Sequence, residues 1–495
     1  MSKLEIYPID SVHIKVDCDK STAKELSSFF TFSVPNYQYT PAYKNKLWDG
    51  QIRLYNIHTQ KIYRGLQDYV VKFAEDRNYS YNLHIEDTKP IPNDEIIKFI
   101  KDKIKPASKG NRIKLYDHQI DGILHSINKK RCLLLSPTGS GKSLIIYCLL
   151  RYYDMIIPKD KKILVVVPTT GLVSQMYNDF KDYSSINGWD VEENCHVIYS
   201  GKDKETNKRI VISTWQSIYN MHEKYFNQYN VIFGDECHLY KAKSLTKLMG
   251  NLKDCPYRIG TTGTLDGTST NKLVIEGLFG RVYNVTSTKK LMDKKLLSDL
   301  EIECLVLNYK REEIEKIKRA KYHDEMKWLV ENKNRNNFIS NLCCKIKGNV
   351  LLLFNYVESH GKPLHELIKE TCSDRKIFFI HGGTDTEQRE EIRNIIDKEE
   401  NAILIASYGT CSTGINIKNI HNIIFSSPSK SVIRVLQSIG RGLRKSESKN
   451  NVKLYDISDN LSYKKYKNHT LKHFAERLKI YTNENFSFSI KKIRI

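Results

Sequence analysis

The stretch RCLLLSPTGSGKS, residues 131–143, decides the fold of this chain. It begins with a short apolar run, continues through a glycine-rich turn and ends where a helical pattern starts. Glycines let backbone N–H groups approach a phosphate without an intervening Cβ, and a helix N-terminus adds partial positive charge. The stretch therefore predicts a phosphate-binding loop between a strand and a helix, although Ser136 stands where such loops usually have their first glycine. A Gly-Ser turn with an incidental lysine is the alternative interpretation. The candidate phosphate-binding residues are Pro137, Thr138, Gly139, Ser140, Gly141, Lys142 and Ser143.

Further apolar runs follow this stretch, with helix-favouring segments between several of them. That alternation predicts an α/β fold in which helices cover a parallel sheet. A second region repeats the pattern, and the two regions join near residues 283–295. The expected strands of the first region are Arg131–Leu135, Lys162–Val167, Ile210–Ser213, Val231–Gly234 and Arg258–Gly260, and those of the second are Asn349–Phe354, Lys376–Ile380, Ala402–Ser407, Asn422–Ser426 and Val452–Tyr455.

The two ends of the chain do not follow this alternation. Thr22 and Glu25 fit a capping box that opens a helix running to Phe30. Residues 47–54 contain Asp-Gly and predict a hairpin, and residues 101–110 have the composition of a linker. Near the C-terminus, apolar residues recur at helical spacing and predict a short helical tail. We therefore expect a small α+β domain (1–105), two lobes (106–285 and 286–458) and a helical tail (459–495).

Composition limits the class of protein. The 495 residues carry a formal net charge of +22 with a pI near 9.3, and a soluble protein this basic usually binds a polyanion. A solvated basic surface without a partner is the alternative.

The N-terminus lacks the pattern of a signal peptide, and the apolar runs are too short to span a bilayer, so we expect a cytoplasmic protein with no membrane partner. The 11 cysteines include no Cys-x-x-Cys pair and are expected to be buried free thiols.

Two adjacent acids follow the apolar run that ends at residue 234. Asp235 is expected to hold Mg²⁺ beside the phosphates, and Glu236 to orient and deprotonate the attacking water. A zinc site at Cys237 and His238 is excluded because no partners stand at ligand spacing. Adjacent acids at a strand end are common on surfaces, so the pair gains weight only from its place after the phosphate loop.

The second region supplies arginines. Residues 437–444, QSIGRGLR, have helical character, and Arg441 and Arg444 are three residues apart, which places them on one helix face. Arginines that reach a γ-phosphate stabilise charge in the transition state of phosphoryl transfer. A solvated basic helix is the alternative.

Taken in order, these motifs resemble the superfamily-two helicases of the DExH type, over residues 112 to 455 or so. The resemblance implies two RecA-like lobes with ATP between them, and it places His238 and Gln437 among the catalytic residues. It also implies that Gln119 reads the adenine, that Thr262-Gly263-Thr264 couples hydrolysis to lobe movement, and that further residues bind the nucleotide (Gly414, Asn416) or the nucleic-acid backbone (Thr169, Thr214, Thr413).

The chain is also similar, over nearly its whole length, to the UvsW helicases of T-even-like phages. The stretches that carry this similarity are 45–55, 235–239, 285–292, 359–362 and 406–419. The resemblance implies a recombination and repair helicase that remodels branched DNA, with an N-terminal domain that binds DNA through Lys44, Lys46, Trp48, Arg53 and Tyr55. The structural alternative for Trp48 is a residue packed on the core of the small domain.

The expected function is thus an ATP- and Mg²⁺-dependent DNA helicase. Its expected partners are branched, single-stranded or duplex DNA, with RNA–DNA hybrids and a single-strand-binding protein as further candidates. An RNA helicase, a double-strand translocase and a non-hydrolysing annealing protein are the rival hypotheses. No motif separates DNA from RNA, because both grips would be on the backbone.

Overall fold

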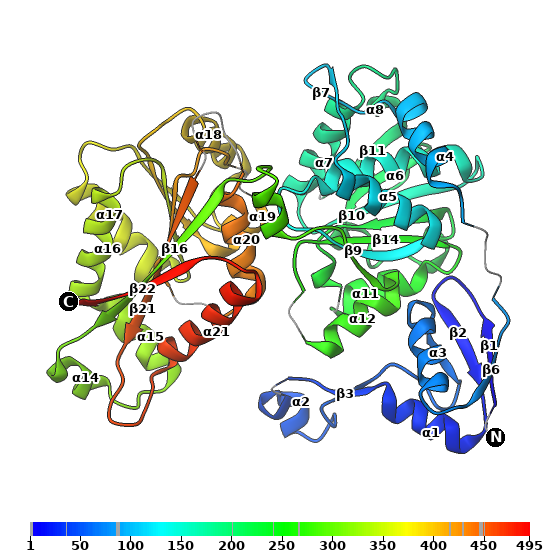
Figure 1. The fold of residues 1–495 in the computed structure, drawn as a ribbon, viewed down its shortest axis with the longest axis horizontal. Coiled ribbons are helices and arrows are strands. Elements are labelled where there is room, and N and C mark those ends of the chain that lie inside the picture. The colour runs from blue at the N-terminus through cyan, green and yellow to red at the C-terminus, as the bar shows by residue number, and fades with distance from the viewer. Residues whose placement is uncertain are drawn as a thin grey trace. The chain divides into compact units, whose positions relative to one another are not determined.

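A computed structural model of the chain describes residues 3–35, 37–85, 90–199, 201–240, 242–265, 268–414, 417–427, 430–444, 449 and 451–495. The chain divides into two compact units, Met1–Ser136 with Gly141–Val285, and Pro137–Ser140 with Thr286–Ile495. Each unit is built around one large parallel sheet (Figure 1).

The N-terminal domain is a small α+β module, as predicted. Its four-stranded sheet has the order β5-β2-β1-β6, in which only the pairing of β1 with β6 is parallel. Leu26, Phe30, Val70 and Phe73 are buried in one apolar core beside the sheet. The elements are β1 (Lys3–Pro8), β2 (His13–Asp17), α1 (Lys20–Phe29), β3 (Thr31–Ser33), η1 (Tyr37–Tyr39), α2 (Pro41–Lys44), β4 (Gln51–Arg53), β5 (Lys61–Tyr63), η2 (Arg64–Leu66), α3 (Gln67–Glu75) and β6 (Ser80–Leu83).

Two local predictions in this domain are wrong. Helix α1 is capped by Asp19, whose carboxylate accepts from the backbone N–H groups of Ser21 and Thr22, so no capping box starts at Thr22. Strand β4 pairs with β3 and not with the residues before Gly50, so residues 47–54 are not a hairpin. Gly50 does have a positive φ of 80°, which makes the turn possible, but the strand partner comes from elsewhere in the sequence.

The prediction of a linker at 101–110 is also wrong, because these residues pack against the first lobe. Ile100 and Ile104 belong to the core of that lobe, and Ala107 is buried. The side-chain amide of Asn187 donates to the carbonyl oxygen of Ile104 at 2.7 Å. The elements here are α4 (Asn93–Phe99), η3 (Ile100–Ile104), β7 (Ala107–Ser108) and β8 (Asn111–Arg112).

The first lobe is a seven-stranded parallel sheet in the order β11-β12-β10-β13-β14-β9-β15. Alternate residues of β10 face opposite sides, so Ile163 and Val165 join one core while Leu164 and Val166 join the other. All five predicted strands are present. The elements are α5 (Asp117–Lys129), β9 (Arg131–Leu135), α6 (Lys142–Ile156), β10 (Lys162–Val167), α7 (Thr170–Tyr183), α8 (Val191–Asn194), β11 (Cys195–Ile198), β12 (Ile210–Thr214), α9 (Trp215–Ile218), α10 (Glu223–Phe226), β13 (Tyr229–Gly234), η4 (Cys237–Leu239), α11 (Lys243–Asn251), β14 (Tyr257–Thr262), α12 (Ser269–Phe279) and β15 (Val282–Asn284).

The second lobe repeats this architecture with the order β18-β19-β17-β20-β21-β16-β22, again all parallel. Its five predicted strands are also present. The elements are α13 (Thr288–Asp293), β16 (Asp299–Asn308), α14 (Arg311–Ile317), α15 (Tyr322–Glu331), α16 (Lys333–Lys345), β17 (Val350–Phe354), η5 (Val357–Gly361), α17 (Lys362–Thr371), β18 (Ile377–Ile380), α18 (Thr386–Ile396), β19 (Ile403–Ser407), α19 (Tyr408–Gly414), β20 (Asn422–Phe425), α20 (Val432–Gly442), β21 (Asn451–Asn460), α21 (His469–Asn483) and β22 (Phe488–Arg494).

The C-terminal helix is confirmed as α21, but the segment is more than a tail. Strand β22 follows the helix and extends the sheet by pairing with β16. The guanidinium of Arg477 on α21 lies 2.7 Å from the carboxylate of Asp456 on β21, and both side chains are buried. The C-terminal residues are therefore an integral part of the second lobe.

Nine cysteines are free as expected, eight of them buried and Cys18 half-buried. The other two, Cys344 and Cys372, form a disulfide between α16 and α17, so the expectation of free thiols is wrong for this pair. In the part of the chain that the structure describes, no helix has the length and apolar character needed to cross a bilayer.

Candidate active site

The glycine-rich loop follows β9 and leads into α6. Gly139 and Gly141 have φ angles of 83° and 85°, a region that L side chains rarely adopt. Gly141 is the N-cap of α6, and a Cβ at this position would collide with Nε2 of Gln119. The backbone conformation therefore favours glycine at 141, and the side-chain amide of Gln119 packs closely against it.

Gln119 lies in the first turn of α5 and is buried. Its Oε1 accepts from the backbone N–H of Tyr116 at 3.0 Å. The structure thus brings the residue predicted to read the base next to the loop predicted to hold the phosphates.

Two side chains at the start of α6 are oriented by neighbours. Nζ of Lys142 donates to the carbonyl oxygen of Ser136 at 3.1 Å, which places the ammonium over the loop. The hydroxyl of Ser143 lies 2.9 Å from the hydroxyl of Tyr183. Sequence reasoning missed Tyr183, since 40 residues separate it from the loop.

The two acids follow directly from the end of β13. The backbone N–H of Asp235 donates to the carbonyl oxygen of Val166 on β10, and Oδ1 of Asp235 accepts from the hydroxyl of Thr261 at 2.8 Å. Glu236 has a φ of 50°, so the chain turns sharply at this residue. Thr261 was also missed, although it stands next to the predicted Thr262–Thr264 segment.

His238 connects these acids to the next strand. Its Nδ1 lies 3.2 Å from Oε2 of Glu236 and 3.1 Å from Oγ1 of Thr262 on β14. Thr262 in turn donates to the carbonyl oxygen of Thr264, and its own carbonyl oxygen accepts from the N–H of Ser136 in the glycine-rich loop. A continuous chain of contacts thus joins the acids, the 262–264 segment and the loop.

The electrostatics of this cluster fit a nucleotide with a divalent cation. Desolvation and the neighbouring carboxylate of Glu236 raise the pKa of Asp235, whereas the ammonium of Lys142 and the hydroxyl of Thr261 act in the opposite direction. Two carboxylates at one strand end carry more negative charge than a single lysine offsets. Asp235 and Ser143 offer oxygen donors of the kind that Mg²⁺ prefers, so the residues present suit that ion.

The first-lobe residues predicted to grip nucleic acid stand at the carboxyl ends of parallel strands. Thr169 caps α7 after β10, and its hydroxyl accepts from the N–H of Leu172. Thr214 ends β12, is buried and lies 2.8 Å from the hydroxyl of Ser217. The side-chain amide of Gln216 donates to the carbonyl oxygen of Pro168, which ties the two segments together.

The second-lobe motifs lie on two helices that pack together, α19 and α20. Thr413 and Gly414 are the last residues of α19, and Asn416 lies outside the described residues. Gln437 is buried in the middle of α20, and Arg441 is close enough to Cys411 of α19 to act on the pKa of its thiol. Helix α20 ends at Gly442, so Arg444 stands just beyond it. The prediction that Arg441 and Arg444 share a helix face is therefore wrong.

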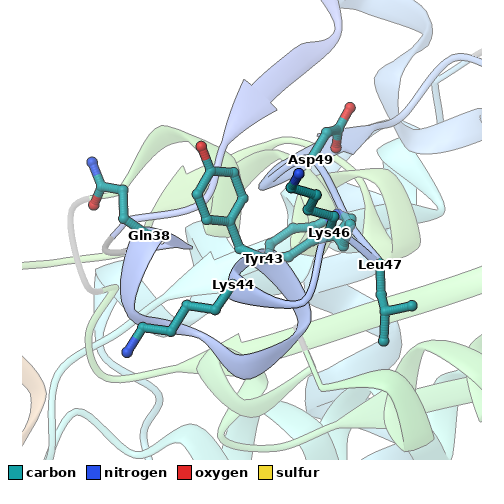
Figure 2. A pocket seen from close by; sticks show the side chains of 7 residues that line it. Gln38, Tyr43, Lys44, Lys46, Leu47 and Asp49 are labelled. Atoms are coloured by element: carbon teal, nitrogen blue, oxygen red, sulfur yellow. The ribbon is translucent and has the colours of Figure 1, made fainter.

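The predicted DNA contacts of the N-terminal domain separate into two groups. Lys44, Lys46 and Trp48 line an open hollow of about 600 Å³ together with Gln38, Tyr43, Leu47 and Asp49 (Figure 2). Trp48 is half-buried and donates from Nε1 to the carbonyl oxygen of Gln51 at 2.8 Å. By contrast, Arg53 is ion-paired with Asp49, and Tyr55 is buried in the domain core, which excludes Tyr55 as a stacking surface.

Family models match three separate stretches of the chain. The model described as "DNA helicase UvsW, N-terminal" matches residues 4–86. The models "Type III restriction enzyme, res subunit" and "Helicase conserved C-terminal domain" match residues 95–267 and 334–446.

Individual relatives extend this result to the whole chain. The ATP-dependent DNA helicase uvsW of Enterobacteria phage T4 is 31% identical over 511 aligned residues, which cover 99% of this chain and 100% of the relative. The DNA 3'-5' translocase XPB2 of Sulfurisphaera tokodaii is 22% identical, with 83% of this chain and 91% of the relative covered.

Two solved structures share the fold of this chain. The ATP-dependent Type ISP restriction-modification enzyme LlaBIII bound to DNA shares the fold, with a TM-score of 0.54 at 15% identity over 77% of this chain and 31% of that one. The crystal structure of T4 UvsW matches with a TM-score of 0.53 at 29% identity over 99% of both chains. Since a relative more than 30% identical spans the whole length, the chain belongs to the UvsW family of ATP-dependent DNA helicases.

Proposed function

We propose that this chain is a DNA motor that uses ATP hydrolysis to unwind and remodel branched DNA. The observation that carries the proposal is the contact chain from Glu236 through His238 to Thr262, which links the candidate catalytic acid to the next strand. A protein that bound ATP without using its hydrolysis to drive movement would have no need of such a link.

In this proposal each residue of the first lobe has one task. Lys142 binds the phosphates, Ser143 and Asp235 hold the metal ion, and Glu236 accepts a proton from the attacking water. Bound ATP supplies the γ-phosphoryl group that is transferred to water, and Mg²⁺ neutralises charge on the phosphates. His238 holds the carboxylate of Glu236 in place and reports its state to Thr262.

The second lobe contributes Gln437, Arg441 and Arg444, which we assign to the γ-phosphate and to the stabilisation of charge in the transition state. Gly414 and Asn416 are assigned to the nucleotide. The backbone of DNA is held by Thr169 and Thr214 in the first lobe and by Thr413 in the second. A grip on phosphates and sugars is independent of sequence and is weakened by salt.

The N-terminal hollow is assigned to DNA as well. Lys44 and Lys46 would neutralise phosphates, and Tyr43 and Trp48 offer aromatic surface to an unpaired base. Junctions and forks present both duplex and unpaired strands, and we include RNA–DNA hybrids among the substrates because the grip does not read bases.

The test is ATP hydrolysis with branched DNA, single-stranded DNA, RNA–DNA hybrid or RNA at fixed salt. We expect branched and single-stranded DNA to stimulate the wild-type enzyme more than RNA does. Lys142→Ala and Glu236→Gln should each lower kcat by at least about 100-fold, because each removes a group that acts on the reacting atoms. Wild-type rates in both variants would overturn the site, and stimulation by RNA alone would overturn the choice of DNA.

A further inference from the structure

A short basic hairpin follows β21 in the second lobe. The backbone N–H groups of Tyr463 and Tyr466 each donate to the other's carbonyl oxygen at 3.0 Å, which leaves Lys464 and Lys465 at the tip. Lys464 has a positive φ of 54°, as a tight turn requires. Lys464, Lys465 and Lys467 are all exposed.

The hairpin is anchored by a buried polar cluster below it. Asn468 accepts from the N–H of Leu461 and donates to the carbonyl oxygen of Asp459, so it closes the base of the hairpin. The carboxylate of Glu325 accepts from the side-chain amide of Asn468 and from the N–H groups of His469 and Thr470 at 2.8–2.9 Å. Because Asn468 and Glu325 are buried, the lysines project from a fixed base.

A second basic segment lies against this hairpin. Residues 461–472 contain four lysines and no acid, and residues 316–321 contain four basic residues and no acid. Nζ of Lys318 lies 5.6 Å from the ring centre of Tyr463, and the ring of Tyr322 packs edge-on against His469. The exposed Asp324 is near these segments, but the carboxylate of Glu325 is already occupied by N–H donors.

The strand order places this cluster at the edge of the sheet predicted to meet nucleic acid. Strand β21 runs parallel to β20 and β16, so the hairpin emerges at the carboxyl end of the sheet, as does α19 after β19. The order β19-β17-β20-β21 separates the two by three strand spacings of about 4.8 Å each. At about 3.4 Å per nucleotide of one strand, that is a length of roughly four nucleotides.

We propose that the hairpin 463–467, with Lys318 and Lys472 beside it, is a second-lobe binding site for the phosphate backbone of DNA. Exposed lysines suit phosphates as point charges, whereas lysine is depleted from the cores of protein–protein interfaces. The site binds a DNA strand that has passed α19, so that the second lobe contacts a longer stretch of its backbone. This inference rests on the proposed function, since it presumes that DNA crosses this edge.

The test compares the triple variant Lys464→Ala/Lys465→Ala/Lys467→Ala with a control of equal charge change on the same lobe. The control is Lys345→Ala/Lys347→Ala/Lys398→Ala, whose exposed lysines lie at the end of α16 and in the connections that enter β17 and β19 at the opposite edge of the sheet. Binding of fluorescein-labelled single-stranded and forked DNA to the full chain is measured by anisotropy at several salt concentrations, and thermal midpoints show that both variants are folded.

We expect the hairpin variant to raise Kd for DNA about tenfold at low salt. Its slope of log Kd against log salt should fall by about 2, because three lysine–phosphate contacts are lost. ATP hydrolysis without DNA should keep its wild-type rate, while the DNA concentration for half-maximal stimulation rises. The control should bind as the wild type does.

Wild-type Kd and salt slope in the hairpin variant, or equal weakening in both variants, would overturn the inference. Failure of the proposed function would look different, because the wild type itself would then hydrolyse no ATP in the presence of any DNA.

Discussion

Lys449 is a buried lysine whose position explains how the end of the arginine-bearing helix is held. Its Nζ donates to the carbonyl oxygens of Gly442, Lys418 and Ile420 at 2.6–2.9 Å. The first of these is the last residue of α20, and the other two follow α19 in the chain. One buried Nζ thus contacts the last carbonyl of the helix and connects it to the neighbouring segment.

Burial lowers the pKa of Lys449 from 10.5 to about 7, with the charge of Asp397 acting in the opposite direction. The unfolded chain therefore holds a proton between pH 7 and 10.5 that the folded chain has released, and the free energy of unfolding rises with pH in this window. We expect Lys449→Met to remove this slope. The advantage of the wild type over the variant should grow by about 1 kcal/mol per pH unit from pH 7 to 9.

The measurement is unfolding of both proteins at pH 7, 8 and 9 and at constant ionic strength. The nearby His421 does not interfere, because burial and Lys449 lower its pKa and keep it neutral throughout. Lys418→Met is the matched control, since it removes an exposed lysine from the same segment. A stability gap that stays constant with pH would contradict the assignment.

Residue types revealed much of the candidate site, but not its contacts. Lys142, Asp235 and Glu236 could be found because phosphoryl transfer needs a lysine in a glycine-rich loop and two acids at a strand end. The partners Tyr183 and Thr261 could not, because each meets the site only through the packing of distant segments. Tyr55 misled for the same reason, since its burial is a property of the folded domain.

At the scale of elements, the short, wholly apolar strands were predictable, whereas the exposed β22 and the long β16, which carries three acids among its apolar residues, were not. Strands such as β10 and β19 are buried on both faces and therefore read as apolar runs. Strand β22 is at the sheet edge, mostly exposed, and contains three basic residues, so it carries no such signal. Strand β4 was assigned to the wrong partner because the Asp-Gly turn is local information, while its pairing with β3 is not.

The disulfide between α16 and α17 gives an element-scale prediction. Cys344 and Cys372 are 28 residues apart, and closing a loop of this length stabilises a fold by about 3.6 kcal/mol in the chain-entropy account. We expect a reductant to lower the thermal midpoint of the wild type but not that of Cys344→Ser/Cys372→Ser. Alkylation of the unfolded, unreduced wild type should modify nine of the 11 cysteines. Modification of all 11 would show that the bond does not form.

At the scale of the whole molecule, the N-terminal domain and the first lobe belong to one compact unit. Helix α12, which follows the 262–264 segment, contributes Val274 to the core of the N-terminal domain. Oε2 of Glu276 on the same helix accepts from the hydroxyl of Tyr69 at 2.8 Å, and Oε1 accepts from the N–H of Val282. The core of the N-terminal domain is thus attached to the helix that follows the 262–264 segment.

The contact between η2 and α12 depends on two glycines at the point where these segments cross. A Cβ at Gly65 would collide with the carbonyl oxygen of Glu276, and one at Gly277 would lie 2.9 Å from Cβ of Tyr63. Since a backbone atom cannot step aside as a flexible side chain does, Gly65→Ala should force η2 away from α12 at a cost of about 1–3 kcal/mol. Hydrogen exchange in α12 and α3 should then quicken, and stimulation of ATP hydrolysis by DNA should fall while the rate without DNA remains. Gly250→Ala is the control, because a Cβ there meets no atom within 4 Å and alanine favours helix α11, in which Gly250 lies. If α12 exchanges at the wild-type rate in Gly65→Ala, the two domains tolerate the added methyl group, and the close crossing is not what holds the N-terminal domain to the first lobe.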